Sequence, residues 1–363
     1  MFRLLIAVVI AMTSACASDA NENPFEVEAI ADFDEPWAMA FLPDGRLLVT
    51  EKKGQLLVVS GRDGSSATVS GVPSVDYGGQ GGFGDVALHP DFADNQQIYL
   101  SYVESGDDNT RGAVVSRATL DLTAGSESLQ DLEVIWRQVP KVSGRGHYGH
   151  RLLFSDDGYL FVSSGERQKF DPSQDMNGNL GKILRLNDDG TVPQDNPFAE
   201  RGGVTAEIWS LGHRNPLGIA FDADGQLWNV EMGPRGGDEL NRVLRGANYG
   251  YPIVSNGRHY SGKDIPDHDT RPEFEAPKAW WTPVISPGDF IIYDGNLFSA
   301  WKGDGLIAGL SAQALVRIEF DGENAREAER YLMGNRIRAV SQGPAGAVWL
   351  LEDGGRLLKL TPR

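Results

Sequence analysis

The sequence predicts an all-β protein with the architecture of a six-bladed β-propeller, and two observations carry this prediction. Six times along the 363-residue chain, a short polar turn precedes a run of alternating apolar residues. These turns recur about every 60 residues, close to the length expected for one propeller blade. Strands of a β-sandwich array, the alternative that such a pattern leaves open, would recur roughly every 8 to 12 residues.

Each turn and the run after it are expected to contribute to one blade. An Asp-Gly pair permits the positive φ of a tight reversal, and an alternating run presents one face to each neighbouring sheet. We therefore expect each run to be an inner strand whose end points toward the central channel. In chain order the units are Asp44-Gly45 before 47–51, Asp94-Asn95 before 98–103, Asp157-Gly158 before 160–166, Asp224-Gly225 before 227–231, Asp304-Gly305 before 306–310, and Ala345-Gly346 before 348–352.

Composition agrees with a closed β-architecture. The 44 glycines and 19 prolines suit many short strands joined by turns, and no interior segment has the composition of a linker. Closed all-β folds carry this length as one unit, so residues 24–363 are predicted to form a single propeller domain. The formal charge of −18 argues against nucleic acid and anionic membranes as partners. A neutral or cationic ligand, or a bound metal, is more compatible with this negative electrostatic potential.

The N-terminus has the layout of a secretory signal. One basic residue precedes a short apolar run and small residues, which predicts a signal peptide over 1–17 and an exported protein. Two cleavage sites compete: Ala15-Cys16-Ala17 is an A-x-A site, whereas Ser14-Ala15-Cys16 ends like a lipoprotein box. Cleavage before Cys16 would leave it as a lipidated N-terminus, so the protein is predicted to be periplasmic or anchored to the outer membrane. Because Cys16 is the only cysteine, no disulfide forms within the mature chain.

Two polar segments between the predicted strands are candidates for chemistry. Five glycines surround Gln80 within 77–84, a composition that also suits a flexible surface turn. Two histidines and two arginines stand among glycines in 143–151. Imidazole titrates near neutral pH, so His147 is a candidate general base, with a structural histidine as the alternative. His150 should point to a different side, and a structural role is favoured for it.

Three later polar segments are further candidates. Arg214 and Asn215 follow an apolar strand. The 231–239 segment and Tyr249 combine Gly-Pro carbonyls with carboxylates, hard oxygens that suit Ca²⁺ but that also occur in a turn with solvated acids. Strand alternation would place Arg336 and Arg338 on one face. Such a pair either holds a planar polycarboxylate or forms a solvated edge.

Taken in order, these segments resemble the glucose/sorbosone dehydrogenase family, the soluble aldose sugar and glucose dehydrogenases that carry pyrroloquinoline quinone (PQQ). The resemblance begins at Pro36-Trp37, extends to the last strand, and depends on the ordered set rather than on any one motif. Its motifs are GQGG with ALHPDF, GKILRLNDDG with DNPF, EIW with RNPLG, GPRGGDELN with NYGYP, PVISPGDFIIYDG, and RIRAV. The family fold is a six-bladed propeller, in agreement with the turn count.

The resemblance implies a PQQ- and Ca²⁺-dependent dehydrogenase that oxidises the C1 hydroxyl of aldoses to the lactone and passes electrons to an external acceptor. His147 matches the base that takes the hydroxyl proton, and Glu166 lies where its carboxylate partner is expected. The remaining roles are cofactor contacts for Gln80, Arg214, Asn215, Arg336 and Arg338, catalytic calcium for the carbonyls of Gly233 and Pro234, and a structural calcium for Glu239 and Tyr249.

Two departures from the family pattern bear on the site. The family carries a cofactor-contacting lysine near 311–313, where this chain has Ser-Ala-Gln. His150 replaces a small residue, which would narrow the pocket or alter the pKa of the base. Two other functions fit the fold: a calcium-dependent propeller lactonase, which would leave the arginine pair without a task, and a noncatalytic sugar- or protein-binding propeller.

Overall fold

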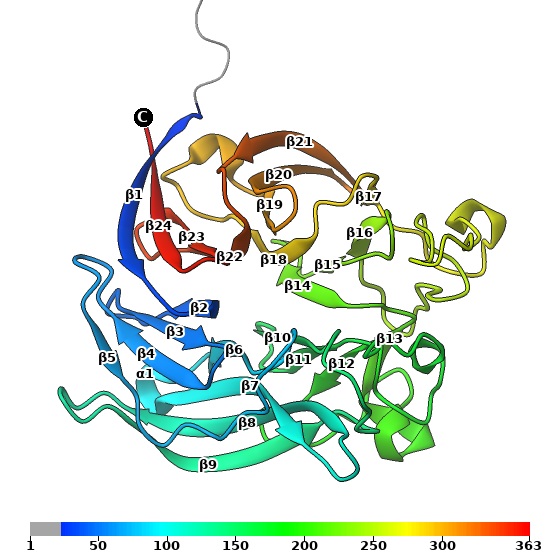
Figure 1. Ribbon diagram of the computed structural model, residues 1–363, viewed down its shortest axis with the longest axis horizontal. Coiled ribbons are helices and arrows are strands. Elements are labelled where there is room, and N and C mark those ends of the chain that lie inside the picture. Colours follow the sequence, from blue (N-terminus) through cyan, green and yellow to red (C-terminus); the bar gives the residue numbers. More distant parts are fainter. Residues whose placement is uncertain (1–22) are drawn as a thin grey trace, which may run out of the picture.

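The computed structural model describes residues 23–363, which form six four-stranded antiparallel sheets arranged like propeller blades (Figure 1). The all-β, six-bladed prediction is confirmed. The predicted signal segment 1–17, with Cys16, lies outside the described residues. No helix within 23–363 has the length and apolar character to span a membrane. The short helical turns there are α1 (Phe92–Asn95), η1 (Asp171–Ser173), η2 (Ala199–Arg201), η3 (Gly203–Glu207), η4 (His268–Thr270) and η5 (Ser299–Trp301).

Blades 1 to 5 follow the chain, each with its strands ordered from the axis outward. Blade 1 contains β2 (Pro36–Phe41), β3 (Leu47–Glu51), β4 (Gln55–Val59) and β5 (Ser66–Thr68). Blade 2 contains β6 (Phe83–Leu88), β7 (Gln97–Ser105), β8 (Arg111–Asp121) and β9 (Ser128–Arg137). Blade 3 contains β10 (Gly149–Phe154), β11 (Leu160–Ser164), β12 (Lys182–Leu186) and β13 (Ile208–Leu211).

Blade 4 contains β14 (Pro216–Phe221), β15 (Leu227–Glu231), β16 (Asp238–Arg242) and β17 (Ala279–Trp281). Blade 5 contains β18 (Pro287–Ile292), β19 (Gly305–Gly309), β20 (Ala314–Asp321) and β21 (Asn324–Leu332). Blade 6 contains β22 (Ile337–Gln342), β23 (Val348–Glu352) and β24 (Arg356–Pro362), with β1 (Phe25–Asp32) as its outer strand. Because β1 pairs with β24, the two ends of the described chain close the ring in one sheet (Figure 1).

The six apolar runs form the second strand of each blade, not the innermost one as we expected. The innermost strands β2, β6, β10, β14, β18 and β22 precede the turns and pack against one another around the axis. Our prediction began each unit at its turn, so it placed the start of the blade one strand too late. The second strand is largely buried because both of its faces are covered by neighbouring blades; in β3, for example, every residue is buried.

The predicted turns are confirmed in four blades. Gly45, Gly158, Gly225 and Gly346 all have positive φ, and each donates its N–H to the carbonyl three residues earlier at 2.8 to 3.0 Å. Blade 2 differs, because Asp94 and Asn95 belong to helix α1 and Gln96 takes the left-handed conformation. In blade 5 the positive φ falls at Gly303, and Gly305 already belongs to β19.

A β-bulge recurs near the start of every innermost strand, where its pairing with the second strand shifts register. Beside these bulges, a buried ion network joins the blades at the axis. Arg151 of blade 3 contacts Asp85 of blade 2 and Asp289 of blade 5, each at 3.3 Å, and stacks over Trp37 of blade 1 at 4.2 Å. Asp289 in turn accepts the Val340 N–H of blade 6 at 3.0 Å. Polar contacts at the axis therefore fix the blades relative to one another.

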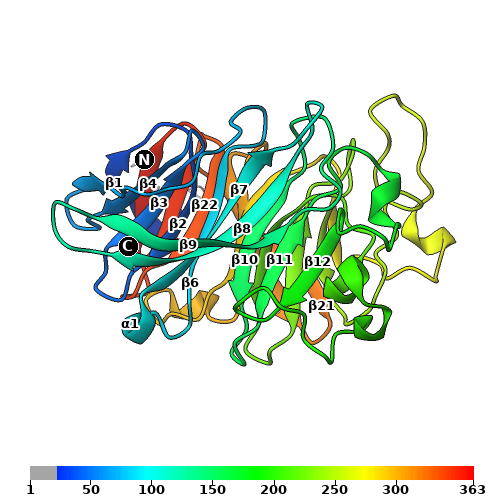
Figure 2. The same cartoon turned by 90° about the horizontal axis from the view of Figure 1, so that it is seen from below.

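Long connections emerge at the rims of the blades. The segment between β16 and β17 extends away from the body of the propeller, as the side view shows (Figure 2). It carries Tyr251 and Tyr260, which reappear at the candidate site.

Candidate active site

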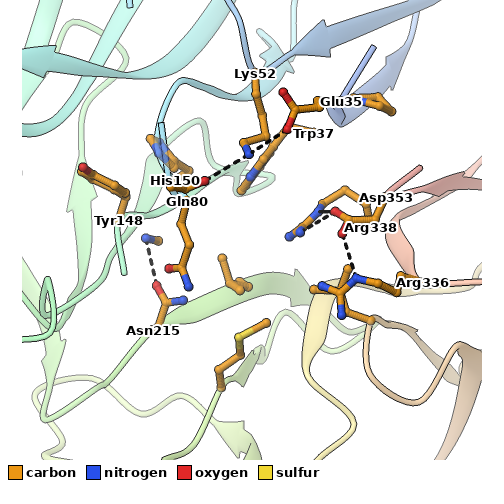
Figure 3. Close-up of a pocket in the computed structure, with 16 residues that line it drawn as sticks. Glu35, Trp37, Lys52, Gln80, Tyr148, His150, Asn215, Arg336, Arg338 and Asp353 are labelled. Carbon is orange, nitrogen blue, oxygen red and sulfur yellow. Dashed lines mark hydrogen bonds and ion pairs between the residues drawn. The ribbon is translucent and has the colours of Figure 1, made fainter. Parts of the chain in front are cut away.

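A cavity of about 270 Å³ lies where the innermost strands of several blades begin and their second strands finish (Figure 3). In blades 1, 4, 5 and 6 the residue before the innermost strand pairs with the residue after the second strand. In each pair the second residue donates its backbone N–H to the first one's carbonyl; the pairs are Glu35/Lys52, Asn215/Met232, Ser286/Leu310 and Arg336/Asp353. Seven of these eight residues line the cavity. The propeller therefore directs side chains from four blades at one space.

Four of the five residues predicted to bind the cofactor meet in this cavity: Gln80, Asn215, Arg336 and Arg338. Gln80 accepts the His147 N–H at 2.8 Å, and Asn215 accepts the Gly149 N–H at 3.2 Å. Each carbonyl oxygen is thus occupied by the loop that carries the predicted base, while the side-chain amides lie at the cavity (Figure 3). The Gln80 loop needs its glycines: at Gly79, with φ of +61°, a Cβ would lie 2.6 Å from the Arg145 carbonyl oxygen.

Arg336 and Arg338 share one carboxylate. Asp353 accepts from Arg336 Nε at 2.8 Å and from Arg338 Nε and Nη2 at 2.9 and 2.7 Å. Burial opposes ionisation of Asp353, but Arg338 and Arg336 outweigh it and hold the pKa of Asp353 below its usual range. One carboxylate does not neutralise two guanidinium groups, so this wall of the cavity is positively charged. The predicted face-sharing arginine pair is present and suits a polycarboxylate.

His147 and Glu166 form a buried pair. His147 Nδ1 lies within hydrogen-bond distance of Glu166 Oε1. The same Glu166 side chain also accepts the Phe170 N–H at 2.7 Å. With Glu166 accepting at Nδ1, the imidazole carries its proton on that nitrogen, and Nε2 is left with the lone pair. The carboxylate partner predicted for His147 is therefore in place.

The electrostatics of the pair suit a proton acceptor. Burial lowers the pKa of His147, and this exceeds the opposing effect of Glu166. Burial would raise the pKa of Glu166, but its hydrogen bond from His147 lowers it below the usual value. Near neutral pH the pair is a neutral imidazole beside an ionised carboxylate. This is the protonation state that a general base requires.

The loop that carries His147 is held in a sparsely populated conformation. His147 has φ of +52° and His150 has φ of +78°, both in the left-handed region. Arg167, itself at φ of +62°, stacks on Tyr148 at 3.7 Å and donates to the carbonyls of Gly146 and Gly144 at 2.8 and 2.6 Å. Because this guanidinium is buried, its pKa falls to about 10, which still leaves it charged at neutral pH.

His147 opens into a second, smaller pocket of about 190 Å³, whose walls include Phe170, Tyr251 and Tyr260. The two spaces adjoin, because neighbouring residues line them: His147 and Tyr148 on one loop, Arg214 and Asn215 on another. Tyr260 is largely exposed and Phe170 is partly exposed, although both are aromatic. Flat aromatic faces beside a base are a suitable surface for the apolar face of a sugar ring.

Arg214, predicted as a cofactor contact, lies at the smaller pocket and not in the larger cavity. Its Nη1 donates to the carbonyls of Met232 and Gly233 at 2.8 and 2.6 Å. The Gly233 carbonyl predicted to bind calcium thus already accepts a guanidinium, and Pro234 lines the pocket with His147. A carbonyl oxygen has two lone pairs, so this set fits a cation only if Ca²⁺ shares Gly233 with Arg214 or displaces it.

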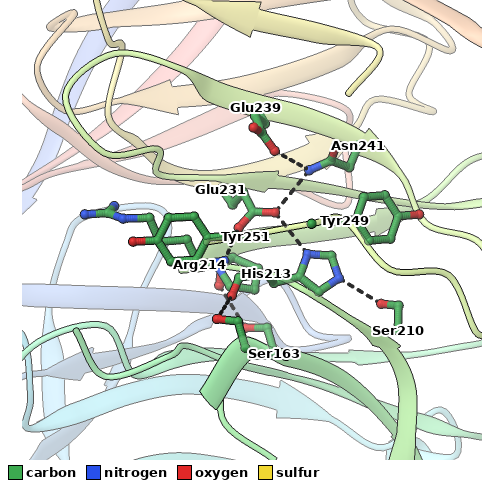
Figure 4. Close-up of polar contacts among 12 residues, drawn as sticks. Ser163, Ser210, His213, Arg214, Glu231, Glu239, Asn241, Tyr249 and Tyr251 are labelled. Carbon is green, nitrogen blue, oxygen red and sulfur yellow. Dashed lines mark hydrogen bonds and ion pairs between the residues drawn. The ribbon is translucent and has the colours of Figure 1, made fainter. Parts of the chain in front are cut away.

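The predicted structural calcium ligands lie in a buried polar network (Figure 4). His213 contacts Glu231 at 2.9 Å and Ser210 at 2.9 Å, and its ring stacks on Tyr249 at 4.6 Å. In the same network, Glu239 lies 3.5 Å from His268. Burial raises the pKa of Glu239.

Among the described residues, Asn241 Oδ1, both polar side-chain atoms of Asn229 on the paired strand, and His268 Nδ1 are buried without a hydrogen-bond partner. Such orphaned groups are rare and indicate a missing ion or water. Only the oxygens of this set, Asn241 Oδ1, Asn229 Oδ1 and the Glu239 carboxylate, are of the kind that binds a hard cation; the amide nitrogen of Asn229 is not. Within residues 23–363, however, no three histidine or acidic side chains are grouped as metal ligands.

His150, for which a structural role was expected, packs within the cavity wall. Its Nδ1 lies 2.7 Å from Ser101 Oγ, and its ring stacks on Tyr148 and meets Trp37 edge-on. Burial lowers the pKa of His150 to about 3, so the ring is neutral. The segment 311–313 brings no cation to the cavity; Ser311 donates to the Val284 carbonyl at 3.2 Å.

Sequence reasoning missed several residues of the site. Arg167 directly follows Glu166, yet its role in holding the His147 loop depends on carbonyls from distant turns. Phe170, Tyr251 and Tyr260 were missed because aromatic residues in loops carry no periodic signal. Lys52 was missed although it follows the first apolar run directly; its position past the end of a second strand was a usable signal.

Together, the fold and the site define a six-bladed propeller with a buried histidine–carboxylate pair beside a cavity that carries two arginines. The chain belongs to the Glucose / Sorbosone dehydrogenase family, whose model matches residues 33–359. The aldose sugar dehydrogenase YliI of Escherichia coli is 39% identical, with 99% of this chain and 98% of that protein covered.

Two further comparisons concern the cofactor. Quinoprotein glucose dehydrogenase B of Acinetobacter calcoaceticus is 31% identical over 94% of this chain and 87% of its own length. The PQQ-bound aldose sugar dehydrogenase of Streptomyces coelicolor superposes with a TM-score of 0.78 at 29% identity, covering 95% of this chain and all of that one.

Proposed function

We propose that this protein oxidises the C1 hydroxyl of aldose sugars to the lactone with PQQ and Ca²⁺, and passes the electrons to an external acceptor. The observation that carries the proposal is the His147–Glu166 pair, which opens beside a cavity walled by Arg336 and Arg338. Family membership supports the same reaction class, and the names of the relatives support PQQ.

In this proposal the chain's own residues position both reactants. The arginine pair and the amides of Gln80 and Asn215 bind the carboxylates and polar edge of the cofactor. His147 Nε2 takes the proton of the C1 hydroxyl, and Glu166 stabilises the imidazolium that forms. When bound, PQQ supplies the electrophile that accepts the C1 hydride as a two-electron oxidant, and Ca²⁺ polarises it as a Lewis acid.

We further propose that Gly233 and Pro234 hold the catalytic Ca²⁺, and that Glu239 and Tyr249 hold a structural one. The secretory pattern of 1–17 supports export to the periplasm, or to the outer membrane if Cys16 is lipidated.

The test is dye-linked oxidation of aldoses by apoprotein, with PQQ and Ca²⁺ added separately and together, and with a chelator. Activity is expected only with both additions. His147→Gln should reduce turnover by about 10²- to 10⁴-fold while PQQ still binds. His89→Gln, in blade 2 beside Asp188, is the matched control and should retain activity. Absence of both activity and PQQ binding in the unmodified protein would refute the proposal.

A further inference from the structure

We propose that Lys52 is a binding residue for the cofactor's carboxylates and supplies the positive charge at the Gln80 wall of the cavity. This inference rests on the proposed function, because it concerns the same PQQ site. Lys52 follows β3, its side chain is 17% exposed, and its Nζ donates to the Gly79 carbonyl at 3.1 Å (Figure 3).

The position of Lys52 in its blade matches that of Asp353 in blade 6. Pro36 pairs with Glu51 and Ile337 pairs with Glu352 at the ends of the first and second strands. One residue further out, Lys52 donates its backbone N–H to Glu35 at 3.0 Å, and Asp353 donates to Arg336 at 2.8 Å. Both pairs join opposite charges at the cavity. In blade 1, however, the carboxylate precedes the innermost strand and the cation follows the second strand, whereas blade 6 has the reverse arrangement.

The ion pair in blade 1 is looser than the one in blade 6. Lys52 Nζ lies 3.7 Å from Glu35, beyond hydrogen-bond distance, whereas both arginines of blade 6 bond Asp353 directly. Glu35 is also engaged by the hydroxyl of Tyr77 and by Lys53 at 3.8 Å. An ammonium has three donors. With one donated to Gly79, Lys52 keeps N–H groups for an anionic ligand at the cavity.

Charge at this wall depends on Lys52. The charged residues that line the cavity are Lys52, Arg336 and Arg338 against Glu35 and Asp353. His150, which lines the same wall near Gln80, is neutral because of its burial. The segment 311–313 of blade 5, where the family pattern would bring a lysine, supplies none. Lys52 therefore offsets Glu35, and without it the charges that line the cavity would sum to zero.

The test is PQQ titration of purified apoprotein in Ca²⁺ buffer, followed by quenching of tryptophan fluorescence. Lys52→Met should raise the Kd by about 10- to 100-fold, as expected for loss of a charge-assisted hydrogen bond. Lys52→Arg should recover most of the affinity. The matched control is Lys302→Met, since the exposed Lys302 donates to Asn296 and does not line the cavity; its Kd should change by less than about twofold.

A second variant, expected to change the Kd for PQQ in the opposite direction, keeps the test decisive if Lys52→Met does not fold. Glu35→Gln keeps the shape of the side chain but removes a carboxylate from the cavity, so it should lower the Kd. Failure of the unmodified protein to bind PQQ would refute the proposed function itself. Binding by the unmodified protein with an equal Kd for folded Lys52→Met, or a Kd raised by Glu35→Gln, would overturn the role of Lys52 alone.

Discussion

Blade 3 and blade 6 each place a nitrogen-bearing side chain before the innermost strand and a carboxylate past the second strand. In blade 3 these are His147 and Glu166, and both are buried. In blade 6 they are Arg336, whose side chain is 48% exposed, and Asp353, which is 28% exposed. The same topology thus serves two purposes. Desolvation in blade 3 adjusts proton affinity, whereas partial exposure in blade 6 keeps permanent charges available to a ligand.

The two blades also differ in backbone conformation at these positions. His147, His150, Arg167, Gln168 and Phe170 all have positive φ, whereas no residue of 335–342 does. Left-handed conformations of non-glycine residues persist only where surrounding contacts enforce them. Blade 3 therefore holds its pair with extra contacts such as those of Arg167, while blade 6 relies on regular strand geometry.

The largest effect that would test this comparison is expected at Glu166. Glu166→Gln should lower kcat by about 10²- to 10⁴-fold with little change in PQQ affinity. The neutral amide would no longer orient the His147 ring as a carboxylate does or stabilise the imidazolium that forms. Steady-state kinetics and PQQ titration measure the two quantities. Glu207→Gln is the control: this half-buried carboxylate of the blade 3 region accepts from Trp136 and Asn179, away from the pocket. A weakened PQQ affinity with kcat intact would contradict the proton role of blade 3.

The next effect concerns the axis that joins the two regions. Arg151→Met leaves Asp85 and Asp289 buried without their cation and should lower the free energy of unfolding by about 3 to 5 kcal/mol. Urea denaturation would measure this loss. Arg117→Met removes an exposed pair with Glu133 and should cost less than about 1 kcal/mol. Equal losses for both variants would show that the axial network does not hold the blades.

A smaller effect is expected in blade 6. Arg338→Met should raise the Kd for PQQ by about 10- to 100-fold, whereas kcat at saturating PQQ should stay close to that of the unmodified protein. Arg336→Met should raise it less, because Arg336 is the more solvent-exposed of the two. Fluorescence titration and steady-state kinetics separate binding from turnover. A loss of kcat without a change in Kd would assign chemistry to blade 6.

The smallest effect is a difference in pH dependence. Burial lowers the pKa of His147 below 6.5, so its neutral form persists below that pH. Protonation removes the base, and kcat/KM should therefore fall on the acid side, with its midpoint below about pH 6.5. The arginines stay charged, so PQQ affinity should show no inflection from them between about pH 6 and 8. A midpoint above 6.5 would contradict the desolvated base.

The site shows how far sequence reasoning reached. Gln80, Asn215, Arg336 and Arg338 were predicted as one binding group, and they line one cavity. Arg214 was placed in the same group but lies at the neighbouring pocket, where it binds the carbonyls of Met232 and Gly233. That separation depends on which backbone oxygens come within its reach, and no local pattern records this.

Local sequence determined the number of blades, the four Gly-containing turns and the motifs that carry the family resemblance, because hydrophobic alternation and positive φ are properties of neighbouring residues. The tertiary structure decided which strand is innermost, that Arg151 crosses the axis, and that Lys52 shares a cavity with Arg336. These features follow from closure of the ring and from burial. Both depend on residues far apart in the chain, so the desolvation that lowers the pKa of His147 arises only once the blades have packed.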